Sequence, residues 1–116
     1  MDGNEPEKEM RNDRLITLTF RLEEGIKELL DKFAIKQRLP RSVVIRYSIE
    51  KLVKEEPKYE GVYVPPGSGK LVVISFKVDK ETKEKLENYA RNQRASRSET
   101  IRYAVIRLLK EEGVLD

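Results

Sequence analysis

The pattern of hydrophobic and polar residues changes twice within the first half of the chain. Between residues 15 and 22 every second residue is apolar, which is typical of a strand with one buried face. From Ile26 to Ala34 the apolar residues recur at intervals of three and four, which indicates one face of a helix. A polar turn follows, and a second stretch with helical spacing runs from Ile45 to Val53. The pattern therefore predicts a strand, a helix, a turn and a second helix.

The same pattern returns after about 56 residues as an internal repeat. Residues 15–56 align with residues 71–112 without a gap, and about 17 of the 42 aligned positions are identical. Agreement of this kind far exceeds what coincidence between two amphipathic segments produces. The chain therefore carries two copies of one structural unit.

The repeat predicts how the chain is divided. Residues 1–14 are polar and of mixed charge, and we expect a disordered tail there. The first repeat occupies residues 15–56, and the second occupies residues 71–116. Residues 57–70 contain the Pro and Gly residues of a linker, in which the segment Tyr59 to Val64 either adds a short strand or packs on the body.

Two repeats in one chain solve a problem that one repeat cannot. A unit of about 42 residues is too small for a stable core, and a single strand leaves its backbone groups unpaired. We therefore predict a mainly α fold in which the two strands form an antiparallel β-ribbon and four helices bury their apolar faces. The linker is long enough to connect the repeats as an intramolecular pseudo-dimer, since 14 residues span roughly 45 Å when extended. The alternative is an arrangement in which two chains exchange repeats.

The starts of the helices carry capping signals that differ between the repeats. Ser96 and Glu99 have the spacing of a capping box at the last helix, and Asp79 is a good N-cap for the helix before it. The first repeat has Pro40 in place of Ser96, which suits an early helical position but loses the cap.

Both repeats resemble the ribbon-helix-helix family of DNA-binding regulators, of the MetJ, Arc and CopG type. The matching strings are LTFRLEE, LLDKFA and RSVVIRYSIEKL in the first repeat, and ISFKVDK, KLENYA and SRSETIRYAVIRLL in the second. The resemblance covers about three quarters of the chain. Members of the family usually carry one copy and dimerise, so this chain is similar to tandem versions such as those of small archaeal or viral regulators.

The resemblance implies that the ribbon lies in the DNA major groove and that its outward side chains read the bases. These side chains are Thr17, Thr19, Arg21, Val73, Ser75 and Lys77. Their chemistry agrees, because threonine and arginine supply donors and acceptors, the arginine fork suits guanine, and Val73 suits a thymine methyl group. The alternative is that Thr and Ser simply occupy a solvated strand face.

The resemblance also implies phosphate contacts at the N-terminus of the last helix of each repeat, where free N–H groups and the helix dipole favour an anion. The candidate residues are Arg38, Arg41, Ser42, Arg94, Ser96, Arg97 and Ser98. The alternatives are a solvated turn for the arginines and pure capping for Ser96. We interpret Arg46, Tyr47, Arg102 and Tyr103, which are identical in the two repeats, as packing and ion-pair residues between helices, with a DNA or oligomer role as the alternative.

Composition limits the other functions. The chain has no Cys and no His, which removes disulfides, thiolate or imidazole zinc sites and Cys- or His-based catalysis. The string Gly67-Ser68-Gly69-Lys70 is not a phosphate-binding loop, because Val64 stands five residues before Gly69 and Leu71 follows the lysine. We therefore expect no enzyme activity, no cofactor, no metal and no small-molecule substrate.

The expected partner is double-stranded DNA, with self-association along the duplex. The net charge of +3 is modest, so the placement of charge matters more than its sum. No apolar run approaches the length of a membrane span, and we expect a cytoplasmic protein, in the host cytoplasm if it is viral, from a thermophilic source. The rival functions are a protein-interaction module of the antitoxin type and a structural helical dimer.

Overall fold

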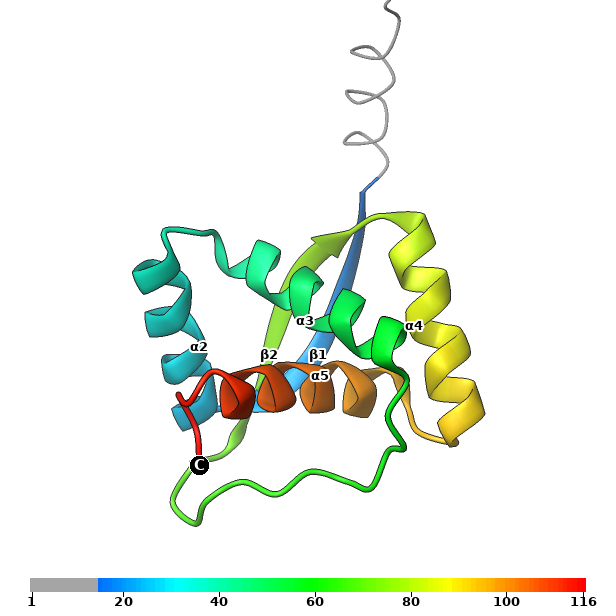
Figure 1. The fold of residues 1–116 in the computed structure, drawn as a ribbon. Helices are drawn as coiled ribbons and strands as arrows, with labels where there is room; N and C mark the ends of the chain where they lie inside the picture. Colours follow the sequence, from blue (N-terminus) through cyan, green and yellow to red (C-terminus); the bar gives the residue numbers. More distant parts are fainter. Residues whose placement is uncertain (1–14) are drawn as a thin grey trace, which may run out of the picture.

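The predicted order of strand, helix and helix occurs twice in the computed structural model, which describes residues 15–116. The elements are β1 (Ile16–Glu23), α2 (Glu24–Gln37), α3 (Arg41–Glu55), β2 (Leu71–Val78), α4 (Lys80–Gln93) and α5 (Arg97–Glu111). Figure 1 shows α3 and α5 at the centre of the molecule, with α2 and α4 on opposite sides of them. The disorder expected for residues 1–14 lies outside the described residues. None of the described helices is both long and apolar enough to cross a membrane.

The two strands pair with each other and confirm the predicted antiparallel ribbon. The register runs from Ile16 opposite Val78 to Glu23 opposite Leu71. Alternate residues of both strands are buried beneath the helices, as the period of two predicted. At the centre of the buried face, the rings of Phe20 and Phe76 pack edge to face with their centroids 5.8 Å apart. These two phenylalanines occupy equivalent positions in the repeats, so they meet where the two halves join.

The last helices of the two halves exchange ion pairs. Lys51 of α3 lies 2.8 Å from Glu111 of α5, and Arg107 of α5 lies 2.6 Å from Glu55 of α3. Lys51 and Arg107 are equivalent repeat positions, as are Glu55 and Glu111, so the two pairs are reciprocal. Between these helices the apolar faces predicted from the sequence form the core. Their fully buried members are Ile45, Ile49, Leu52, Ile101 and Leu109.

The linker completes the start of α2, where the sequence offers no side-chain cap. Glu23 at the N-cap position makes no side-chain capping bond. Instead, the backbone N–H groups of Glu24 and Gly25 donate to the carbonyl oxygens of Lys70 (3.0 Å) and Ser68 (2.7 Å). A Cβ atom on Gly25 would lie 2.9 Å from the Ser68 oxygen, so this close approach requires glycine.

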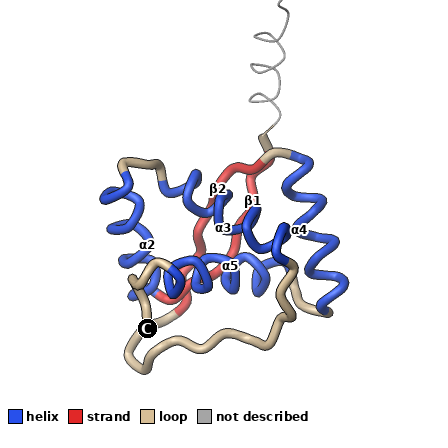
Figure 2. The backbone as a smooth tube through the Cα atoms, in the orientation of Figure 1, coloured by secondary structure: helices blue, strands red, loops and turns tan. Residues whose placement is uncertain are grey.

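The earlier part of the linker packs on the body and adds no strand, which settles that alternative. It runs along α5 as a long connection before it reaches β2 (Figure 2). The rings of Tyr59 and Tyr103 pack edge to face at 5.1 Å, and the Tyr59 N–H donates to Gln93 Oε1 at 2.9 Å. The Tyr89 hydroxyl donates to the Pro57 carbonyl at 2.5 Å, and burial raises the pKa of Tyr89 to about 12.

Candidate nucleic-acid interface

The face of the ribbon that the helices leave open carries all six side chains that were proposed to read bases. Each of the six is exposed. They form three direct cross-strand pairs, which are Thr17 with Lys77, Thr19 with Ser75, and Arg21 with Val73. Opposite residues on one face of an antiparallel pair lie close enough for their side chains to act together. The ribbon therefore gathers residues that are 52 to 60 positions apart in the chain into one surface.

The chemistry of this surface is nearly, but not fully, symmetric. Arg21 and Lys77 are equivalent repeat positions and place a cation at each end, while the hydroxyls of Thr19 and Ser75 lie between them. The ends differ in the partner of the cation. Lys77 lies opposite the hydroxyl of Thr17, whereas Arg21 lies opposite an apolar side chain, Val73, which is 61% exposed.

The first turn of α5 lies beside the end of the ribbon that carries Arg21. The backbone N–H of Arg21 donates to Ser98 Oγ at 3.2 Å. A shallow hollow separates the strand face from the helix start, and it is lined by Thr19, Phe20, Arg21, Val73, Arg97 and Ser98. This arrangement brings two predicted phosphate residues next to three predicted base-reading residues. In the other half, Arg46 of α3 donates to the Lys77 carbonyl of β2 at 2.8 Å.

The two helix starts differ as the capping signals predicted. Ser96 Oγ accepts from the N–H of Glu99 at 3.0 Å, and Glu99 Oε1 accepts from the N–H of Ser96 at 3.0 Å. This capping box is confirmed, as is the Asp79 cap of α4, whose carboxylate accepts from the N–H of Thr82 at 2.9 Å. Pro40 gives α3 no side-chain cap, and the first turn of α3 has no acidic residue. The start of α3 is therefore more open to an anion than the start of α5.

Each of the two arginines at the helix starts shares a carboxylate with a lysine. Arg41 lies 3.3 Å from Asp31, which also holds Lys27 at 3.0 Å. The second half repeats this arrangement at the equivalent positions, where Glu87 lies 3.1 Å from both Lys83 and Arg97. Hydrogen bonding from Lys83, opposed by partial burial and helped by Arg97, holds the pKa of Glu87 below its ordinary value. Each group of three keeps one net positive charge beside a helix start.

Arg38 and Arg94 end the first helix of each half. Both are exposed C-cap residues in the left-handed backbone region, with φ of 60° and 58°, and each cap N–H donates back to carbonyl groups of its helix. Ser42 lies half-buried in the first turn of α3. The structure thus places the predicted phosphate residues of each half around one turn between two helices.

Four residues that are identical in the two repeats were expected to pack and form ion pairs between helices, and this prediction is wrong for most of them. The four are Arg46, Tyr47, Arg102 and Tyr103. Arg46 contacts a strand, as described above, and Arg102 of α5 makes a two-pronged ion pair with Glu23 at the end of β1. Tyr103 contacts the linker, where its hydroxyl donates to the Lys58 carbonyl at 3.3 Å, and Tyr47 is 53% exposed. For the two arginines the antiparallel register causes the difference, because it brings the end of each strand under the last helix of the other half.

Glu23 is the important residue that sequence reasoning missed. Glu23 is 7% exposed, and burial opposes its ionisation. The hydrogen bonds and positive charge of Arg102, together with a backbone hydrogen bond, hold the pKa of Glu23 below its ordinary value. The pair joins residues 79 positions apart, so no local pattern reveals it. It ties α5 to the ribbon next to the proposed reading face.

Comparisons with known proteins place the second half of the chain in a family. The model of the ribbon-helix-helix proteins of the copG family matches residues 72–112. An uncharacterised protein, ORF59b, of Acidianus filamentous virus 1 is 47% identical over 47 residues, which cover 40% of this chain and 80% of the viral protein. Uncharacterised protein 59 of Sulfolobus islandicus rod-shaped virus 1 is 51% identical over 45 residues, which cover 39% of this chain and 76% of that protein.

A third viral protein is similar to the chain, whereas solved structures are not. A protein named ORF59b of Acidianus two-tailed virus is 44% identical over 43 residues, which cover 37% of this chain and 73% of its own length. No solved structure matches the chain significantly. The chain therefore belongs to the family of these small viral proteins, and its residues 72–112 are a ribbon-helix-helix domain of the copG family.

Proposed function

We propose that the protein is a sequence-specific regulator of transcription that binds double-stranded DNA by inserting its ribbon into the major groove. The observation that carries the proposal is the register of the ribbon, which gathers six exposed side chains into three cross-strand pairs on one face. A two-stranded ribbon fits the major groove, where each base pair presents a distinct pattern of donors, acceptors and methyl groups. The match to the copG family supports the same function.

We further propose that the two halves of one chain form a tandem pseudo-dimer. The family model matches only the second half, so the first half depends on the internal repeat and on the structure. The reciprocal ion pairs between α3 and α5, and the contact of Phe20 with Phe76, support equivalent roles for the halves. The linker supports pairing within one chain, because it is bonded both to α4 and to the start of α2.

The unequal ends of the ribbon predict an imperfectly symmetric DNA site. At one end, the fork of Arg21 is suited to guanine and the neighbouring Val73 to a thymine methyl group. At the other end, Lys77 is a flexible point charge and Thr17 accepts or donates, which gives weaker discrimination. We therefore expect the preferred site to contain one well-defined half and one more tolerant half.

Phosphate contacts would fix the ribbon in the groove. The starts of α3 and α5 each offer backbone N–H groups with a neighbouring arginine, and each is attached to a strand of the ribbon through Arg46 or Ser98. Since a single ribbon spans only a few base pairs, we also propose that several chains bind side by side along one duplex.

A salt titration tests the proposal once a bound duplex has been selected from a random pool at fixed salt. About six phosphate contacts predict a slope near −5 when the logarithm of the binding constant is plotted against the logarithm of the salt concentration. Absence of salt-dependent binding to any selected duplex would overturn the DNA-binding function and favour the protein-interaction module.

A further inference from the structure

A groove on the first half of the molecule carries large apolar side chains open to solvent. It lies between the end of α2, the start of α3 and the end of α5, and its lining residues are Phe33, Gln37, Leu39, Val44, Tyr47, Leu108 and Glu112. Tyr47 is 53% exposed and Leu39 is 45% exposed. Figure 1 shows the end of α5 approaching α2, and these two helices border the groove. It takes no part in the proposed DNA contacts of the ribbon.

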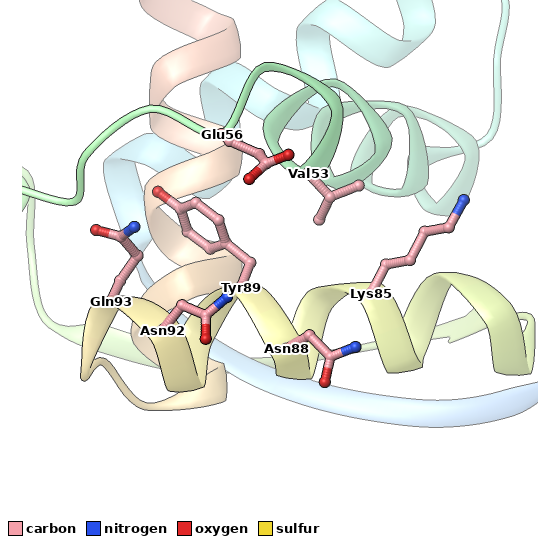
Figure 3. Close-up of a pocket in the computed structure, with 7 residues that line it drawn as sticks. All are labelled: Val53, Glu56, Lys85, Asn88, Tyr89, Asn92 and Gln93. Atoms are coloured by element: carbon pink, nitrogen blue, oxygen red, sulfur yellow. The ribbon is translucent and has the colours of Figure 1, made fainter.

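The equivalent face of the second half is covered by the linker of the chain itself. Tyr47 corresponds to Tyr103, and Gln37 corresponds to Gln93. Tyr103 packs edge to face on the ring of Tyr59, and Gln93 Oε1 accepts the backbone N–H of that same residue. Figure 3 shows Tyr89 and Gln93 on α4 beside Glu56, the residue from which the linker starts. In the second half, an extended segment with an aromatic ring therefore binds to a tyrosine ring and a glutamine amide.

The chain does not repeat this cover on the first half, because it leaves α5 differently from the way it leaves α3. Glu56 ends α3 in the left-handed region, whereas Glu112 ends α5 at φ −86°. The following Gly113 has φ +74°, and the chain then turns back so that the N–H of Leu115 donates to the carbonyl of Leu109. Leu115 is buried there, and Tyr47 stays open.

Charge distinguishes the open groove from its covered equivalent. In the second half, Ile106 lines a hollow together with the linker residues Val62 and Tyr63. The residue equivalent to Ile106 in the first half is Glu50, which is exposed. Glu112 also lines the groove, but its equivalent in the second half is Glu56, so the difference in charge comes from Glu50. Neither carboxylate forms an ion pair with another residue between 15 and 116. A segment that fits this groove therefore needs a basic residue where the linker has a valine.

We propose that this groove binds an extended segment of a partner protein that carries an aromatic side chain followed, a few residues later, by Lys or Arg. The aromatic ring packs on Tyr47 and Phe33, and the backbone beside it donates to Gln37. The basic side chain lies near Glu50. The site is separate from the reading face of the ribbon, but it adjoins the proposed phosphate-binding turn of the first half, since Leu39 lies between Arg38 and Arg41.

The test uses the full chain and two fluorescent synthetic peptides, one with the sequence of residues 57–64 and one with Val62→Lys in that sequence. We expect the Val62→Lys peptide to bind at least tenfold more tightly in an anisotropy titration. Tyr47→Ala in the protein should weaken its binding at least tenfold. Tyr63→Ala, which removes an exposed tyrosine of the linker, is the matched control and should leave binding unchanged. Glu50→Lys should reverse the preference in favour of a Val62→Glu peptide.

Loss of the fold, absence of peptide binding and dimerisation of the chain can be told apart by separate measurements. Thermal unfolding of each variant shows whether it keeps its fold, which is expected because Tyr47 and Glu50 are exposed. Peptide binding that is absent, or that Tyr47→Ala leaves unchanged, overturns the proposal. Sedimentation that reveals a dimer of the chain, lost on Tyr47→Ala, shows that a second copy occupies the groove and also overturns it. Each of these results is independent of whether the chain binds DNA.

Discussion

The backbone N–H of Arg21 on β1 donates to Ser98 Oγ in the first turn of α5, across 77 positions of the sequence. The bond joins the proposed reader of bases to the proposed phosphate-binding turn. Because strand and helix are held together, a phosphate bound at the helix start would fix the height of the ribbon in the groove. Positioning contacts and reading contacts therefore belong to one rigid unit.

Replacing Arg21 tests the reading role. Arg21→Ala should weaken binding to the selected site by about 1–3 kcal/mol and relax the choice of base at one position, because a bidentate contact to guanine is lost. The measurement is the ratio of binding constants for the selected duplex and a single-base variant. Lys85→Ala is a control that removes one positive charge from an exposed residue of α4 that is not among the proposed DNA contacts. An unchanged ratio for Arg21→Ala would argue against reading by the ribbon.

The carboxylate that Arg41 and Lys27 share at the start of α3 predicts that removing the arginine and removing the carboxylate have opposite effects on DNA binding. Arg41→Ala should weaken binding to selected and unrelated duplexes alike and reduce the salt slope by about 1, because it removes a phosphate contact. Asp31→Asn should strengthen both, since it releases Arg41 and Lys27 from their common partner. Weaker binding by Asp31→Asn in a correctly folded protein would mean that this carboxylate orients Arg41 for the phosphate.

The capping box predicts a cost to stability that is specific to one of the two equivalent helices. Ser96→Ala should lower the free energy of unfolding by about 1 kcal/mol, because the N–H of Glu99 loses its acceptor. The matched control is Ser42→Ala in the first turn of α3, since Ser42 makes no side-chain hydrogen bond within residues 15–116. Denaturant unfolding of the two variants gives the comparison, and equal losses would contradict the cap.

The buried pair of Glu23 and Arg102 predicts an acid-sensitive contribution to stability. The pKa of Glu23 is lower in the folded chain than its ordinary value of 4.5. The contribution is therefore complete above that value and is lost as the pH falls through the folded-state pKa. The thermal midpoint of unfolding should decrease as the pH is lowered below about 4.5. The decrease with pH should be less steep for Glu23→Gln. That variant should also be less stable at pH 7, because it leaves the Arg102 guanidinium without its charged partner.

An unchanged acid slope in Glu23→Gln would assign the acid sensitivity to other carboxylates. Asp79 is the main competitor, because burial opposes its ionisation but hydrogen bonds from Thr82 hold its pKa below the ordinary value. Asp79→Asn would then flatten the slope instead.

Local patterns predicted the elements and the faces of this protein, and distant contacts supplied the rest. Alternation in two strands was enough to identify the exposed residues, because the side-chain period of a strand is two. The capping of α5 was equally readable, since Ser96 and Glu99 lie within one turn. The partner of Arg102 was not, because Glu23 reaches it only through the register of a ribbon formed by two distant strands.

The contacts of the linker could not be predicted from local patterns either. Its Pro and Gly residues indicated a connection, but its role at the start of α2 depends on backbone carbonyl groups that no side-chain pattern reveals. Gly25 was a signal, since a glycine stands where the second repeat has Glu81. Its reason became visible only with the carbonyl of Ser68 beside it.

Chemical footprinting of the bound duplex with dimethyl sulphate tests the central claim most directly. Guanine N7 lies in the major groove, and adenine N3 lies in the minor groove. A ribbon in the major groove predicts that guanine N7 is protected at the centre of the site, that adenine N3 is not, and that Arg21→Ala with Lys77→Ala removes the protection. Protection confined to adenine N3, or N7 protection that survives both substitutions, would contradict it.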